Sequence, residues 1–120
     1  MPRVENNLLN GRRFVMVSST ASAVDPEQPT AFRYWESDGV VWGDYEGDTV
    51  TLGRFVGSRE GDVVTISYVH ALKAGGRAGG QSVSRLERED DGRLRLVEEF
   101  QFEGDDTRHV SVCTEVPSTI

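Results

Sequence analysis

Short polar turns that end in glycine recur along this chain and separate runs rich in β-branched and aromatic residues. They are residues 37–39 (SDG), 45–47 (YEG), 59–61 (REG) and 90–92 (DDG). A glycine that ends such a triplet is typical of a three-residue hairpin loop, because its left-handed conformation carries no Cβ penalty in glycine. The pattern therefore predicts a meander of antiparallel strands.

About eight strands follow from this reading, joined by short loops at hairpin spacing. The predicted strands are residues 13–19, 32–36, 40–44, 49–58, 63–71, 80–88, 93–102 and 107–116. No stretch after Thr30 has a helical period. We therefore predict an all-β fold, an antiparallel up-and-down β-barrel of about eight strands whose closure removes the exposed strand edges.

Length and charge limit what such a barrel does. The 120 residues suffice for one domain, residues 1–120, in which residues 1–10 are expected to be a loose leader. A formal net charge of −7 argues against binding to nucleic acid, which needs clustered Lys and Arg, and against anionic membranes. We expect neither partner.

Compartment and cofactors are constrained by what the chain lacks. The N-terminus has no apolar signal-peptide region, no run reaches transmembrane length, and Cys113 is the single cysteine, so a cytoplasmic location is expected. There is no Cys/His cluster with zinc spacing, and the glycine-rich residues 74–80 open no helix. We therefore expect no metal or cofactor, and residues 74–80 are interpreted as a flexible loop over one barrel mouth.

Three-residue loops preserve the parity of the inward side chains from one strand to the next, which predicts an even-numbered inner face. That face would hold Phe14, Met16, Phe32, Tyr34, Val40, Trp42, Val50, Leu52, Val56, Val64, Ile66, Tyr68, Leu86, Leu94, Leu96, Phe100, Phe102, Val110, Val112 and Val116. Gly43, Gly53, Gly57 and Cys113 would lie on the outer face. The turn at residues 90–92 would place Leu86 opposite Leu96 and Ser84 opposite Glu98.

Glu98 and Arg54 are the charged residues that this register sets within apolar stripes. A buried carboxylate without a partner costs several kcal/mol, so Glu98 needs a cation or donors, or is held protonated. One interpretation makes Glu98 an acid, a base or a ligand anchor, with Arg54 and Tyr68 orienting a carbonyl or carboxylate. The alternative is a buried Arg54 to Glu98 ion pair that only fixes the register.

Other candidates share the predicted inner face. His70 would be a general base or a ligand contact at the rim, or a strand-end histidine bonded to a loop carbonyl. Tyr34 and Trp42 would pair as an aromatic wall, and Ser84 is a further polar contact for a ligand. The candidate catalytic residues are thus Glu98 and His70, and the candidate ligand-binding residues are Arg54, Tyr68, Tyr34, Trp42 and Ser84.

A strip of apolar residues on the predicted outer face indicates an interface. Trp35, Val41, Phe55 and Val69 would lie on consecutive strands. Exposed apolar patches often mark contacts with another chain, so a symmetric homodimer through this strip is expected.

The run DGVVWGDYEGDTVTLGRFVGSREGDVVTISYVH at residues 38–70, followed by DGRLRLVEEFQF at residues 91–102, resembles a group of small bacterial calycin-like β-barrel proteins. These proteins are often labelled N-acetylglutamate synthase, a label that gains no support from a chain with no acetyl-CoA-binding strand and helix pattern. The resemblance covers residues 32–116, although the group typically has tryptophan at positions 100 and 102 and histidine at 97. It implies a calycin- or lipocalin-like barrel and directs attention to Tyr68, His70 and Glu98.

Three functions remain open at this stage. The first is a cytoplasmic barrel that holds a small apolar molecule with a polar group in its interior. The second is a cofactor-free isomerase or cyclase of bacterial secondary metabolism in the same barrel, in which Glu98 or His70 moves a proton. The third is a structural or interaction barrel with a filled interior.

Overall fold

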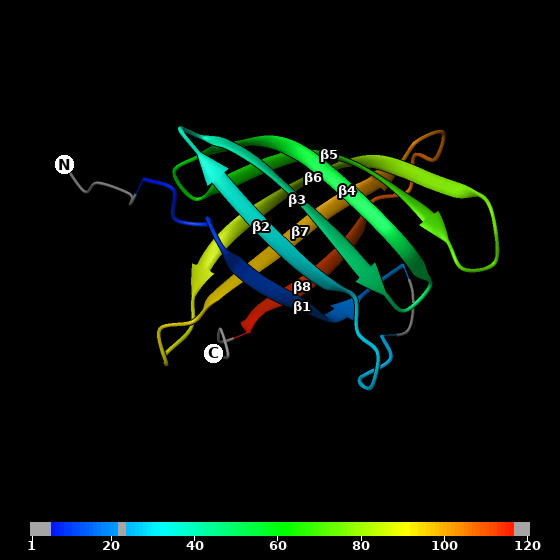
Figure 1. Cartoon of the computed structure of the whole chain (residues 1–120), viewed down its shortest axis with the longest axis horizontal. Helices are drawn as coiled ribbons and strands as arrows, with labels where there is room; N and C mark the ends of the chain where they lie inside the picture. Colours follow the sequence, from blue (N-terminus) through cyan, green and yellow to red (C-terminus); the bar gives the residue numbers. More distant parts are fainter. Residues whose placement is uncertain (1–5, 22–23, 117–120) are drawn as a thin grey trace.

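The runs of β-branched and aromatic residues form eight antiparallel strands in a computed structural model that describes residues 6–21 and 24–116 (Figure 1). The strands are β1 (Arg12–Ser19), β2 (Ala31–Ser37), β3 (Val40–Gly47), β4 (Val50–Glu60), β5 (Val63–Leu72), β6 (Arg77–Arg88), β7 (Leu94–Phe102) and β8 (His109–Val116). Each strand pairs with the next and β8 pairs with β1, which closes the barrel and confirms the predicted fold class. The described residues contain no helix that could cross a membrane.

Three of the hairpin loops contain two residues where three were predicted. Between β3 and β4, at residues 48–49, a bulge between Tyr45 and Gly47 keeps the predicted parity, whereas the other two loops reverse it. Asp38 and Gly39 join β2 to β3 with φ of 50° and 81°, as a type I′ turn requires. Residues 61–62 join β4 to β5, with Gly61 at φ 59° in the first position. A two-residue loop reverses the parity that a three-residue loop preserves, so the inward side chains change from even to odd numbers.

The even-numbered prediction is therefore wrong for β3 and β4. Val41 and Phe55 are buried inside the barrel, whereas Trp42 and Val56 are exposed on its outer surface, as are Val40 and Leu52. The reversals at the two loops cancel, so the even-numbered side chains of β5, β6 and β7 face inward as predicted.

The turn at residues 90–92 gives the predicted pairing, with Leu86 opposite Leu96 and Ser84 opposite Glu98. The last strand departs again from the even-numbered pattern. On β8 the buried residues are Ser111 and Cys113, and Val110 is exposed. Burial in this apolar interior raises the pKa of the Cys113 thiol.

Gly43 and Gly53 face the interior rather than the outer surface that the sequence predicted. A Cβ on Gly53 would lie 2.2 Å from Cζ of Tyr45, and one on Gly43 would lie 2.4 Å from Cζ of Phe55. The aromatic ring of the neighbouring strand thus lies over each glycine, as in aromatic rescue. These two glycines make room for the rings that fill the barrel.

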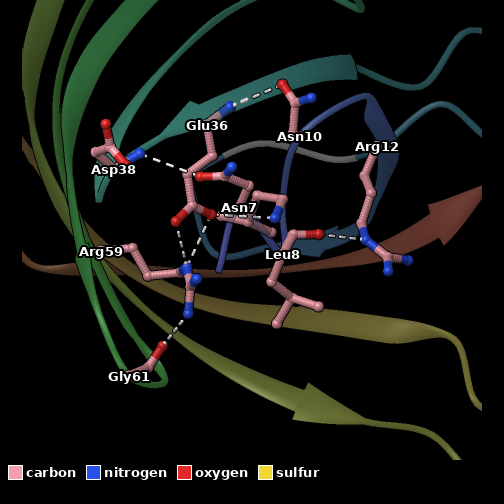
Figure 2. A network of polar contacts seen from close by, with 9 residues as sticks. Asn7, Leu8, Asn10, Arg12, Glu36, Asp38, Arg59 and Gly61 are labelled. Carbon is pink, nitrogen blue, oxygen red and sulfur yellow. Dashed lines mark hydrogen bonds and ion pairs between the residues drawn. The ribbon is translucent and has the colours of Figure 1, made fainter. Parts of the chain in front are cut away.

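The N-terminal segment closes one end of the barrel, at the ends of β2 and β4 (Figure 2). Residues 6–11 form turns, Leu9 is fully buried and Leu8 nearly so. The backbone N–H of Glu36 donates to the Asn10 side chain at 3.2 Å. The predicted loose leader is thus wrong for residues 6–10, and residues 1–5 of it lie outside the described residues.

A buried ion pair joins β2 to β4 next to this segment (Figure 2). Arg59 Nε donates to Glu36 Oε1 at 2.8 Å and Oε2 at 3.0 Å, and the side chains are only 5% and 1% exposed. The backbone N–H of Leu9 donates to Glu36 Oε1 at 3.1 Å. The barrel therefore has an internal ion pair, but it is formed by Glu36 and Arg59 rather than by the predicted Glu98 and Arg54.

The predicted apolar strip does not lie on one surface. Val41 and Phe55 belong to the core, so only Val69 and part of Trp35 are accessible from outside. Trp35 pairs instead with Trp42, whose side chain is exposed. The change of parity on β3 and β4 removes the strip, while the homodimer itself stays a prediction.

Candidate ligand-binding site

The end of the barrel opposite the N-terminal segment contains a cavity of about 320 Å³. It lies among the last residues of β1, β3, β5 and β7 and the first residues of β2, β4 and β6. Its apolar lining is Met16, Ala21, Phe32, Val50, Ile66, Leu72, Ala78, Phe100 and Phe102. Its polar lining is Ser19, Thr30, Tyr45, Asp48, Thr49, Tyr68, His70 and Glu98. The sequence places large apolar residues at strand ends here, and in the described parts of the chain no segment like residues 6–11 covers them.

Aromatic rings from four strands form the cavity wall. Phe32 of β2 stacks on Tyr45 of β3 with ring centroids 5.1 Å apart. Tyr68 of β5 meets Phe100 and Phe102 of β7 edge to face at 6.4 and 6.2 Å. Rings packed in this way lose little entropy on binding because they are already held in place.

His70 and Tyr45 form a hydrogen-bonded pair on this wall. The Tyr45 hydroxyl lies 2.7 Å from His70 Nδ1, and both residues are buried. Burial lowers the pKa of His70 and raises the pKa of Tyr45 well above its usual value, so both groups are neutral at neutral pH. A neutral imidazole paired with a neutral phenol presents a fixed donor and acceptor rather than a charge.

Glu98 is an inward carboxylate at the cavity end of the barrel. It lies half-buried on β7, and its accessible surface opens into the cavity. Ser111 Oγ donates to its Oε1 at 2.9 Å. Burial raises the pKa of Glu98, and the hydroxyls of Ser82 and Ser111 partly offset this because they favour the charged form. Among the described residues no ion pair involves Glu98.

Ser82 adds an unusual feature beside this carboxylate. It is 2% exposed on β6, opposite Ile66 and Phe100, and its Oγ has no hydrogen-bond partner of normal length in the described part of the chain. It is nevertheless close enough to Glu98 to act on its pKa. A buried hydroxyl without a full hydrogen bond costs free energy, which is typical of a site that serves binding or chemistry.

The structure brings together three of the seven predicted site residues. Glu98, His70 and Tyr68 all line the cavity. The Tyr68 hydroxyl donates to the backbone carbonyl of Gln101 at 3.0 Å, and burial raises the pKa of this phenol. These three residues lie on β5 and β7, where the predicted register holds.

The other four predicted residues lie elsewhere. Arg54 is exposed, opposite Asp44 and Val69 on the outer surface, and Trp42 is also exposed there. Tyr34 and Ser84 face inward but do not line the cavity. Tyr34 packs in the core with Phe14 and Phe55. The predicted inward placement of Arg54 and Trp42 is wrong because the loop at residues 38–39 reverses the parity.

Tyr45 is a cavity residue that sequence reasoning missed. It was assigned to a turn, whereas β3 continues to Gly47 and places the Tyr45 ring over Gly53. The signal was present in the dipeptide Asp38-Gly39, which is the strongest short sequence indication of a two-residue type I′ loop. Counting from that loop would have turned Tyr45 inward.

Comparison with known proteins bears on this closed barrel and its cavity. A family model described as avidin-like protein matches residues 7–116, from the N-terminal segment to the end of β8. The chain belongs to the avidin-like protein family. The match includes every strand and every residue of the avidin-like barrel that lines the cavity.

This membership fits the calycin-like fold and, in general terms, a barrel that binds small molecules. It supports the resemblance to small barrel proteins at that level. No curated protein and no solved structure matched the avidin-like chain. In the described residues no group of three or more His, Cys, Asp or Glu side chains is arranged to hold a metal ion.

Proposed function

We propose that the protein binds a small, mostly apolar molecule with one polar group in the open end of its barrel. The observation that carries this proposal is the cavity of about 320 Å³, whose lining surface is mostly apolar and is formed largely by packed aromatic and aliphatic side chains. Small-molecule sites are typically clefts of about 300–1,000 Å³ with this kind of lining.

The polar groups support recognition of one end of such a molecule. Glu98 lies on β7, and the Tyr45 to His70 pair joins β3 to β5. Burial is the main reason why the pKa of His70 is lowered and the pKa of Glu98 is raised, which shows that water has little access to both groups. A hydrogen bond between a ligand and these groups would therefore be little weakened by competing water. The apolar walls contribute affinity, and these groups fix the orientation of the ligand.

The same groups favour a second function, a cofactor-free isomerase or cyclase. Burial raises the pKa of Glu98 and lowers the pKa of His70, so the two pKa values lie closer together than those of the free side chains. Groups in a cleft whose pKa values burial has shifted are typical candidates for acid and base catalysts. In this function Glu98 moves a proton while the neutral Tyr45 hydroxyl, accepting a hydrogen bond from His70 Nδ1–H, polarises a carbonyl.

Two measurements test the binding proposal. Native mass spectrometry of the purified protein, before and after denaturation, looks for a released small molecule. In parallel, the fluorescence of Nile red is titrated with the wild type, with Ala78→Phe, which places a ring in the cavity, and with Gln81→Phe, which places the same ring on the exposed outer face of β6.

We expect the dye to bind the wild type and Gln81→Phe, and to bind Ala78→Phe at least about tenfold more weakly, a loss of about 1.4 kcal/mol. Equal binding to all three proteins would place the dye outside the cavity and contradict the proposal. Absence of both dye binding and a released molecule would favour a filled structural barrel. Conversion of a released molecule by the wild type, but not by Glu98→Gln, would favour the enzyme.

A further inference from the structure

We propose that the polar group of the ligand is a cation, a protonated or quaternary amine that lies against Glu98 within the aromatic wall of the cavity. This inference rests on the proposed binding function and names its ligand class. Three observations lead to it: the charge of the lining, the lack of a basic partner for Glu98, and the aromatic character of the wall.

The charged lining of the cavity is entirely acidic in the described residues. Glu98 and the half-buried Asp48 line it, whereas the lining contains no lysine or arginine. His70, the one basic side chain of the lining, is held neutral because burial lowers its pKa. An anionic ligand would meet two carboxylates in a poorly hydrated place, so a carboxylate or phosphate head is strongly disfavoured.

Inward carboxylates at the two ends of the barrel differ in their partners. At the closed end, Glu36 accepts two hydrogen bonds from the guanidinium of Arg59. At the open end, Glu98 accepts a hydrogen bond from the Ser111 hydroxyl, and no described arginine or lysine pairs with it. Arg54, which the sequence suggested as its counter-ion, lies on the outer surface. A cationic ligand would supply the opposite charge that favours the ionised form of Glu98.

The aromatic wall of the cavity also favours a positively charged ligand. Phe32, Tyr45, Tyr68, Phe100 and Phe102 line the cavity, and the neighbouring rings are packed edge to face or stacked. Glu98 lines the same cavity as the phenols of Tyr45 and Tyr68, and its charge adds to the effect of burial in raising the pKa of both. Aromatic faces attract cations through their quadrupoles, and rings around a site are the usual means of holding a quaternary ammonium group.

The buried Ser82 hydroxyl, beside Glu98, is a fourth observation. Its Oγ is without a hydrogen-bond partner of normal length among the described residues, beside Glu98 and between Ile66 and Phe100. A protonated amine has N–H donors for such an acceptor, whereas a quaternary amine would rely on the carboxylate and the rings. The two kinds of amine thus give different expectations for Ser82→Ala.

Three probes of similar size separate the ligand classes at pH 8, where His70 is neutral. They are benzyltrimethylammonium, its uncharged carbon isostere 2,2-dimethyl-1-phenylpropane, and the anion 3-phenylpropionate. Binding is followed by NMR chemical shifts of the full chain, for the wild type, for Glu98→Gln and for Glu99→Gln. Glu99 is the matched control, because it is the next residue of β7 and is exposed on the outer surface.

We expect the cation to bind the wild type at least about tenfold more tightly than the isostere, the anion not to bind, and Glu98→Gln to lose at least about tenfold in affinity for the cation. Glu99→Gln is expected to bind as the wild type does. If the isostere or the anion binds as tightly as the cation, or if Glu98→Gln leaves the affinity for the cation unchanged, the inference is overturned.

The Ala78→Phe variant distinguishes these failures from failure of the proposed function. If the isostere binds as well as the cation and Ala78→Phe abolishes its binding, the cavity binds small molecules and only the charge assignment is wrong. If no probe binds while Nile red still does, the charge assignment is again overturned and the binding function stands. If Nile red also fails to bind, both are overturned.

Discussion

Glu36→Gln is the substitution for which the structure predicts the largest loss of stability. It removes the negative charge that faces the guanidinium of Arg59, in a pair whose side chains are 1% and 5% exposed. It also weakens the acceptor of the hydrogen bond from the backbone N–H of Leu9, which holds the N-terminal segment in the barrel end. The folded state would then contain a buried guanidinium whose charge is no longer balanced by Glu36.

The size of the effect follows from this geometry. Removing one partner of a buried ion pair typically costs about 3–5 kcal/mol, because the remaining charge has lost its water and its counter-charge. The free energy of unfolding of a whole domain is about 5–15 kcal/mol, so this loss is a large share of it. At this chain length it corresponds to a fall in melting temperature of about 10–20 °C.

Urea unfolding followed by tryptophan fluorescence measures the loss, because Trp35 and Trp42 lie on the barrel wall. Asp44→Asn is the matched control, since Asp44 also accepts two hydrogen bonds from an arginine, Arg33, but in an exposed pair. Exposed ion pairs contribute little, so a small change is expected there. Equal losses at Glu36 and Asp44, or a loss below about 1 kcal/mol at Glu36, would refute the reasoning.

The other predictions concern the open end of the barrel. Burial raises the pKa of Glu98 in the folded state above its unfolded value, so the wild type loses stability as the pH rises from the unfolded to the folded pKa. Glu98→Gln should therefore raise the free energy of unfolding at pH 8 and change it little near pH 3, and a lower stability at pH 8 would show that the carboxylate has a stabilising partner. Gly53→Ala should cost about 1–3 kcal/mol in urea unfolding, because its Cβ would overlap the Tyr45 ring and force it to move. Tyr45→Phe should cost about 0.5–1.5 kcal/mol by removing the hydrogen bond to His70 Nδ1, and ¹⁵N NMR of the imidazole should show the change at that nitrogen.

Local sequence signals were sufficient for the strands and for part of the site. Strand-forming residues bounded by glycine-containing turns predicted all eight strands to within a few residues at each end. The register of β6 and β7 followed from the turn at residues 90–92, and it correctly placed Glu98 opposite Ser84 and inside the barrel. His70 and Tyr68 were found for the same reason, since the register of β5 was also right.

The misplaced residues share one cause, the length of a loop. One residue more or less in a hairpin loop turns every side chain of the next strand to the other face, although the composition of the strand is unchanged. Asp38-Gly39 thus decided that Trp42 is exposed and that Tyr45 and Val41 are inside. Strands β3 and β4 contain apolar residues at both parities, so their own pattern did not expose the error.

What the sequence by itself determined is the class of fold, a closed meander, because alternation along a strand and the conformational needs of turn residues are local properties. The tertiary structure decided which carboxylate has a partner. Arg59 reaches Glu36 across 23 residues of sequence, while Glu98 lies on the cavity wall without a described basic neighbour. Which side chains come into contact depends on the closure of the barrel and on the number of residues in each loop. Only folding therefore made one end of the barrel a filled, ion-paired closure and the other an open, acidic and aromatic cavity.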